Sequence, residues 1–275
     1  MISIVAEMLT FPFLVRALIV GLLVSLCASV LGVSLVLKRY SMIGEGLSHV
    51  GFGALGISMA TNMAPLTVSI PIVVLAAILL LRLSENSKIK GDAAIALIST
   101  SSLAIGVIII SLTTGMNMDV CNFMFGSILV MTTADVRLSV VLSAVVMVLF
   151  ILFYTRIFAV TFDETFSRAV GTKAGIYNML LAILTAITIV LGMRMMGAKL
   201  ISALVIFPAL ISMRVCKRFF SVISLSAVIA VVCFFIGIVL SYWYSLPTGA
   251  SVVVINLILF VMVNSVNLIR GGINR

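Results

Sequence analysis

The sequence predicts an all-α protein, a polytopic bundle of transmembrane helices with eight or nine spans. The chain is 63% hydrophobic and only 9% charged, whereas a soluble domain carries roughly 25% charged residues. The mean hydropathy is +1.39. Long apolar runs recur from end to end, and no polar region between them is long enough for a soluble domain. We therefore interpret residues 1–275 as a single transmembrane domain.

Apolar segments of membrane-spanning length follow one another along the chain, since a span needs about 20 residues. They are residues 13–37, 41–61, 65–83, 93–113, 134–155, 174–193, 199–215, 220–243 and 250–269. Segment 199–215 contains Pro208, which predicts a kinked or only partly spanning helix. The shorter stretch 116–131, which carries Asp119, predicts a re-entrant or interfacial helix. Eight or nine spans follow.

The basic residues predict the orientation of the chain. The net charge is +9, but Lys and Arg stand in small groups between apolar runs, which indicates orientation in a bilayer and not binding to nucleic acid. If the segments alternate, one set of loops and flanks holds all of the 17 basic residues except Arg16, Arg137, Arg194 and Lys199. The positive-inside rule makes the richer set cytoplasmic. The C-terminus is then inside, and with nine spans the N-terminus is outside.

The stretch "YSMIGEGLSHVGFGALG" contains Glu45 and His49, the chain's one histidine, in apolar or small surroundings. Residues four apart share a helix face, and ionisable groups at membrane depth are costly unless they pair or line a pathway. Carboxylate and imidazole suit zinc, manganese or iron(II). The spacing alone also allows a polar pair that fixes packing, or a proton relay. Small residues, Gly44, Ser48, Gly51, Gly53 and Gly56, predict close approach of another helix.

Five stretches occur in an order that resembles a known family. They are "LVLKRYSMIGEGLSHVGFGALG", "MDVCNFMFGSIL", "FDETFSRAVG", "MGAKLISALVIFPALISMRV" and "LPTGASVVV". Together they resemble the permease subunits of bacterial ATP-binding-cassette importers for zinc, manganese or iron. The resemblance implies that Glu45 and His49 contact the metal, with Asp119 as a weaker candidate. The family's usual aspartate is Glu45 here, so that the carboxylate stands about one bond further from its helix.

The loop "DETFSRAVG" is the second candidate site. Asp163 or Glu164 can cap a short helix, and Gly171 can end it. On the residues alone, an ordinary amphipathic loop helix explains this pattern. The resemblance implies a coupling helix that docks on the ATPase subunit, with Asp163, Glu164, Arg168 and Gly171 at the contact.

The resemblance implies a function as the pathway subunit of an importer, and not as an enzyme. The implied partners are cytoplasmic ATPases, a second permease copy or a paralogue, an extracytoplasmic metal-binding protein and the lipid bilayer of the bacterial plasma membrane. The resemblance also implies that no cofactor is bound permanently and that a divalent metal ion, zinc before manganese or iron, is the transported substrate. Two copies of Glu45 and His49 would offer four ligands, which close a first shell.

Two other functions remain open at this point. An ion-coupled secondary transporter would use Glu45 and His49 as a proton relay, and it predicts an internal repeat of the charged helix, yet the Glu-x-x-x-His pattern has no second copy. A membrane anchor for an enzyme complex would tolerate replacement of both residues.

Overall fold

The structure, a computed structural model, describes residues 10–86, 91–113 and 132–273, and throughout these ranges every regular element is a helix. The helices are α2 (Pro12–Leu37), α3 (Ile43–Thr61), α4 (Pro65–Asn86), α5 (Gly91–Thr113), α7 (Thr133–Leu152), α8 (Tyr154–Phe162), α9 (Glu164–Ala169), α10 (Ala174–Met196), α11 (Ala198–Val215), α12 (Phe219–Tyr244) and α13 (Thr248–Ile273). The predicted all-α class is confirmed.

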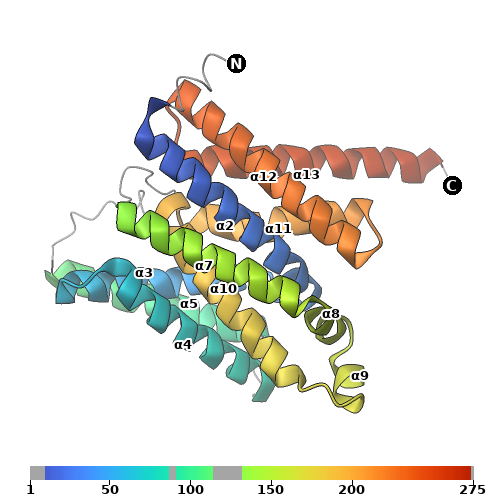
Figure 1. The fold of residues 1–275 in the computed structure, drawn as a ribbon, viewed down its shortest axis with the longest axis horizontal. Helices are drawn as coiled ribbons and strands as arrows, with labels where there is room; N and C mark the ends of the chain where they lie inside the picture. The colour runs from blue at the N-terminus through green and yellow to red at the C-terminus, as the bar shows by residue number, and fades with distance from the viewer. Residues whose placement is uncertain (1–9, 87–90, 114–131, 274–275) are drawn as a thin grey trace.

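The helices form two groups around a common centre (Figure 1). Helices α3, α4 and α5 pack together in one group, and α12 and α13 pack together in the other. Helices α2, α10 and α11 lie between them and contact both groups or each other. The short helices α8 and α9 lie together at one end of the bundle (Figure 1).

Eight helices of the described ranges are long and apolar enough to cross a membrane, and α3 is not one of them. Glycines, serines, Glu45 and His49 lower the hydropathy of α3. Most of its side chains are nevertheless buried against neighbouring helices. A helix that is largely enclosed by protein needs no continuous lipid-facing apolar surface, so α3 can carry polar residues.

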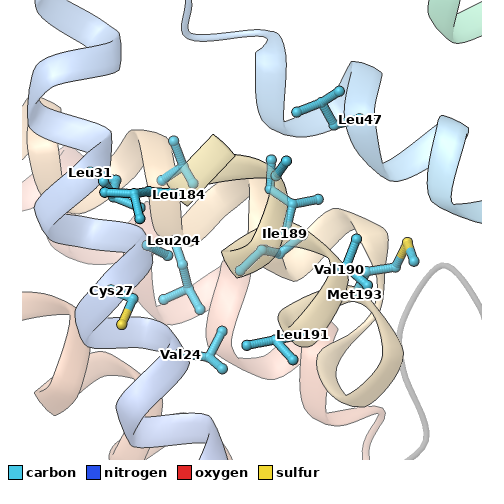
Figure 2. Close-up of a cluster of buried hydrophobic side chains, with 14 of the residues drawn as sticks. Val24, Cys27, Leu31, Leu47, Leu184, Ile189, Val190, Leu191, Met193 and Leu204 are labelled. Carbon is cyan, nitrogen blue, oxygen red and sulfur yellow. The ribbon is translucent and has the colours of Figure 1, made fainter. Parts of the chain in front are cut away.

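The core lies where α2, α10 and α11 meet (Figure 2). Leu31 of α2, Ile189 of α10 and Leu204 of α11 are each at most 1% exposed. Leu47 brings α3 to the same cluster and is 0% exposed. Helices in lipid associate chiefly through close packing and hydrogen bonds, and this cluster supplies the packing that fixes α3 against the centre.

A glycine seam joins α3 to α5, as the small residues of the sequence predicted. A Cβ atom added to Gly106 of α5 would stand 2.8 Å from the Cα atom of Gly53, and one added to Gly53 would stand 3.0 Å from the carbonyl oxygen of Ser102. On another face, a Cβ atom at Gly51 would stand 2.4 Å from the Sδ atom of Met193 in α10. The absence of side chains therefore lets α3 lie directly against two neighbours.

Three expectations about individual segments have different outcomes. The apolar segment 134–155 divides into two helices at Phe153, and α8 continues to Phe162. Helix α11 runs through Pro208 as one helix of 18 residues. The predicted interfacial helix at 116–131, with Asp119, lies outside the described residues.

Candidate functional site

Helix α3 begins directly after a tight turn from α2. Helix α2 ends at Leu37, and Arg39 then adopts a left-handed conformation with φ of 62°. Glu45 lies in the first turn of α3, where a negative charge interacts favourably with the N-terminal end of the helix dipole. The local sequence thus places a carboxylate one turn inside the bundle.

His49 lies on the same face of α3 as Glu45, as the spacing predicted. The His49 Nε2 atom is 3.9 Å from the Glu45 Oε1 atom. The His49 side chain is 17% exposed and that of Glu45 is 34% exposed. Two donors of a tetrahedral zinc ion with bonds of about 2.0–2.1 Å stand roughly 3.4 Å apart, so a small side-chain rotation would bring this pair to metal-binding geometry.

The other ring nitrogen of the histidine has a different environment. The His49 Nδ1 atom is buried, and none of the described residues offers it a hydrogen bond. A metal-binding histidine ordinarily donates from its second nitrogen to an oxygen, which fixes the tautomer. The orientation of this ring is therefore set by packing and by Glu45 within the described part of the chain.

Lys199 is the third member of the site. Its ammonium group forms an ion pair with the Glu45 Oε1 atom, and its side chain is 39% exposed. Lys199 is the second residue of α11, and its neighbours Ala198 and Leu200 are buried. The first residues of helix α11 are therefore packed against other helices of the bundle. Close packing supports this, because a Cβ atom at Gly44 would stand 3.4 Å from the Cα atom of Ser202.

One copy of the chain offers few metal ligands. No group of three or more His, Cys, Asp or Glu side chains that could hold a metal ion occurs among the described residues. Glu45 and His49 are two ligands, and Asp119 lies outside the described residues. A closed metal shell of four ligands thus requires groups from beyond this set.

The second candidate site is built around Glu164. The Glu164 Oε2 atom accepts a hydrogen bond from Asn178 Nδ2 at 3.0 Å and lies 3.4 Å from the Lys38 Nζ atom. The Glu164 Oε1 atom is 2.5 Å from Arg168 Nη2. Lys38 also donates to the Asn178 Oδ1 atom. We call Lys38, Glu164, Arg168 and Asn178 the Glu164 cluster; it ties α9 to the end of α2 and the start of α10.

The charges of the Glu164 cluster stabilise the ionised carboxylate. Partial burial raises the pKa of Glu164, but the hydrogen bonds from Asn178 and Arg168 and the positive charges of Lys38 and Arg168 outweigh this effect. The pKa of Glu164 therefore lies below its ordinary value. This carboxylate is ionised at neutral pH, and its oxygen atoms are bound to groups of the same chain.

The other residues of this loop shape α9, as their chemistry predicted. The Asp163 Oδ1 atom accepts a hydrogen bond from the Phe166 amide at 2.8 Å and caps the helix. Gly171 has φ of 86°, and its amide donates to the Arg168 carbonyl at 3.0 Å. The large exposed side chains of the loop include Arg168, Phe166 and Val170, of which the last two are each 65% exposed. The sequence patterns did not single out Phe166 or Val170.

Long apolar helices around a polar, partly open acid–imidazole pair are typical of a polytopic membrane protein with a site for an ion or substrate. The comparison with known sequences places this one within that class. The profile of the ABC 3 transport family matches residues 10–267, and the chain belongs to this family.

Named relatives extend over almost the whole chain. The manganese import system permease protein ScaB of Streptococcus gordonii is 28% identical over 252 residues, which are 92% of this chain and 90% of the relative. The high-affinity zinc uptake system membrane protein ZnuB of Haemophilus influenzae is 27% identical over 252 residues, 92% of this chain and 97% of the relative. Among solved structures, PsaBC from Streptococcus pneumoniae in complex with Fab matches with a TM-score of 0.85 at 28% identity, and the match covers 96% of this chain and 95% of that one.

Sequence reasoning found Glu45 and His49 but missed the residues that surround them. It grouped Lys199 with the outer loops and flanks and gave it no role, whereas its side chain forms an ion pair with Glu45. No sequence signal pointed to this contact, because the burial of Ala198 and Leu200 on either side of Lys199 appears only in the structure. It also missed Asn178, which gave no pattern because its partners lie 14 and 140 residues away.

Proposed function

We propose that this chain is the membrane-spanning pathway subunit of an ATP-binding-cassette importer for divalent metal ions in the bacterial plasma membrane. The observation that carries the proposal is the pairing of Glu45 and His49 on the partly open face of α3, with 3.9 Å between their facing atoms. Family membership and the named manganese and zinc relatives support it. The chain itself is not an enzyme, and ATP hydrolysis belongs to a separate subunit.

Two copies of the chain, or this chain and a paralogue, meet at the site in this proposal. Each copy contributes one carboxylate and one imidazole, which together make the four ligands of a closed shell. Zinc is the first candidate because it accepts imidazole and carboxylate in tetrahedral geometry, and manganese and iron(II) are the alternatives. An extracytoplasmic binding protein delivers the ion, and cytoplasmic ATPases drive its passage.

The coupling contact is the exposed face of α9. Because Asp163 and Glu164 are engaged within the chain, the ATPase contact falls to the exposed Phe166 and Val170. Arg168 joins them, because its side chain remains 60% exposed while it pairs with Glu164. The C-terminus lies in the cytoplasm with α9, as the distribution of basic residues favours.

Uptake of radioactive zinc and manganese tests the proposed metal site, in cells that lack other importers and produce the partner subunits. We expect His49→Ala and Glu45→Gln to lower uptake at limiting metal by more than about tenfold, because each removes a ligand or its charge. Thr61→Ala is the control, since it alters an exposed polar residue of the same helix. Membrane levels of each variant are compared by immunoblot.

Two outcomes contradict the proposal. Wild-type uptake of both variants at normal membrane levels would show that the pair only fixes packing. Uptake that persists when ATP is depleted but collapses when the proton gradient is dissipated would indicate a secondary transporter.

A further inference from the structure

Lys199 occupies a position that helix stability does not explain. It lies in the first turn of α11, where the helix dipole is positive and disfavours a cation. Its ammonium group is drawn instead to Glu45 of α3, which is 154 residues away in the sequence. Electrostatic attraction across the site, and not local structure, therefore accounts for the placement of this side chain.

The ion pair between Arg194 and Asp135 is a largely buried pair with which the Lys199–Glu45 pair can be compared. Arg194 contacts Asp135 through two atoms, at 3.2 and 3.3 Å, and the two side chains are 15% and 14% exposed. Lys199 contacts Glu45 through one atom, and these side chains are 39% and 34% exposed. The Lys199 pair is thus open and single-contact, so the ammonium group can leave without breaking a packed network.

Lys199 and a metal ion would compete for the same oxygen atom of Glu45. The Oε1 atom that contacts Lys199 is also the atom that lies 3.9 Å from His49 Nε2. A metal ion bound between Glu45 Oε1 and His49 Nε2 would lie next to the Lys199 ammonium group, so that two cations would share one carboxylate. Repulsion between them is substantial in a partly desolvated site. Repulsion therefore favours movement of the ammonium group away from Glu45 when a divalent ion binds at Oε1.

We propose that Lys199 is a tethered counter-ion that occupies the Glu45 carboxylate between transport events, is displaced by the arriving metal ion and lowers the affinity of the site for it. This inference rests on the proposed function and deepens it. The lysine neutralises Glu45 while the pathway is empty, and its return favours release of the ion. Lys199 is a residue that sets affinity and is not itself a ligand.

The test is metal binding by the purified, complete transporter in lipid nanodiscs. Zn²⁺ and Mn²⁺ are titrated separately into wild type, Lys199→Gln, Lys199→Arg and Arg137→Gln, and the dissociation constants are compared. Arg137 is exposed on α7, so Arg137→Gln removes the same charge away from the site. An open ion pair corresponds to an effect of about fivefold. We expect Lys199→Gln to bind both ions about fivefold more tightly, with Lys199→Arg and Arg137→Gln near wild type.

A measurement on the wild-type protein covers the case in which Lys199→Gln does not fold. The rate at which an amine-acylating reagent modifies Lys199 is followed by mass spectrometry with and without Mn²⁺. Displacement by the ion predicts faster modification when Mn²⁺ is present. An unchanged rate, or an unchanged or weaker affinity in a folded Lys199→Gln protein, overturns the inference.

The two proposals fail separately. If His49→Ala loses metal binding while Lys199→Gln binds as wild type does, the metal site stands and the counter-ion role is wrong. If His49→Ala binds and transports normally, the proposed function itself fails.

Discussion

At the scale of single residues, the length of the Glu45 side chain determines which neighbours its carboxylate reaches. The carboxylate extends far enough from α3 to meet Lys199 from α11 and to stand 3.9 Å from His49. An aspartate at the same position withdraws the carboxylate by about one bond length, so it would move away from both neighbours. The charge and the ligand type would remain.

We therefore expect Glu45→Asp to retain metal transport and to weaken the contact with Lys199. The apparent KM for uptake should fall, because the ion no longer competes with a closely held ammonium group, and the ratio of zinc to manganese uptake should change. The measurement is initial uptake over a range of each metal concentration. A complete loss of uptake at a normal membrane level would show that the longer side chain is required.

Glu45 and His49 could be predicted from the sequence because helical periodicity alone brings them together. Lys199 could not, because its contact joins helices that are 154 residues apart. The sequence analysis grouped Lys199 with the outer loops and flanks because it stands between two apolar segments. The sequence could not indicate that the first residues of α11 are packed against other helices, because that depends on how closely Ser202 packs against Gly44.

At the scale of helices, the glycine seam determines how α3 is held. Helix α3 approaches α5 at Gly53 and Gly106 with backbone against backbone. The sequence predicted such an approach from small residues, but α5 as the partner emerges only from the packing. A side chain inserted there must push the helices apart, because backbone atoms cannot rotate away.

We expect Gly106→Ala to destabilise the protein by about 1–3 kcal/mol, the usual cost of overpacking. Its added methyl group would lie 2.8 Å from the Gly53 Cα atom. Gly175→Ala is the matched control, because nothing lies within 4 Å of the added atom. Thermal unfolding of the purified protein in detergent measures both. Equal stability of the two variants would mean that the helices move apart without cost.

The Glu164 cluster predicts that the packing of α9 against the ends of α2 and α10 depends on pH. The folded pKa of Glu164 is below the ordinary value of 4.5, so its contribution to stability is fully present above that value. The contribution is lost as the pH falls through the lower, folded pKa. Proteolysis of the α9 loop should therefore accelerate at acidic pH in the wild type. Glu164→Gln should be cleaved faster at neutral pH and show a smaller response to acid.

A separate prediction concerns the exposed face of α9. Phe166→Glu should abolish stimulation of ATP hydrolysis by the loaded binding protein, because it places a charge where we propose that the ATPase docks. The side chain is 65% exposed, so folding should be unaffected. ATP hydrolysis by the reconstituted complex is the measurement, and normal stimulation would move the docking surface elsewhere.

At the scale of the whole molecule, the sequence predicted the helical class and the positions of most helices. Strong apolar runs accounted for this success, since each run can only be a helix in lipid. The break at Phe153 and the continuation of α8 to Phe162 were not predicted, because hydropathy does not mark where one helix ends and another begins. The orientation in the membrane stays a prediction.

Cysteine labelling from outside intact cells tests that orientation. Ser167 is a poor reporter because it is 3% exposed. We therefore choose Val170→Cys, at 65% exposure, for the cytoplasmic side, and Met63→Cys, at 58%, for the outer side. In a background without the natural cysteines, an impermeant reagent should modify position 63 and not position 170. The reverse pattern would invert the topology.

The distance along the chain between Glu45 and Lys199 has a consequence for biosynthesis. A membrane protein is inserted as it is synthesised, so α3 leaves the ribosome 154 residues before its partner lysine does. During that interval the carboxylate is in the nascent bundle without the ammonium group that neutralises it in the finished protein. Insertion of α11 next to α3 ends this interval. The ion pair can therefore form only after helices from the first and second halves of the chain have packed together.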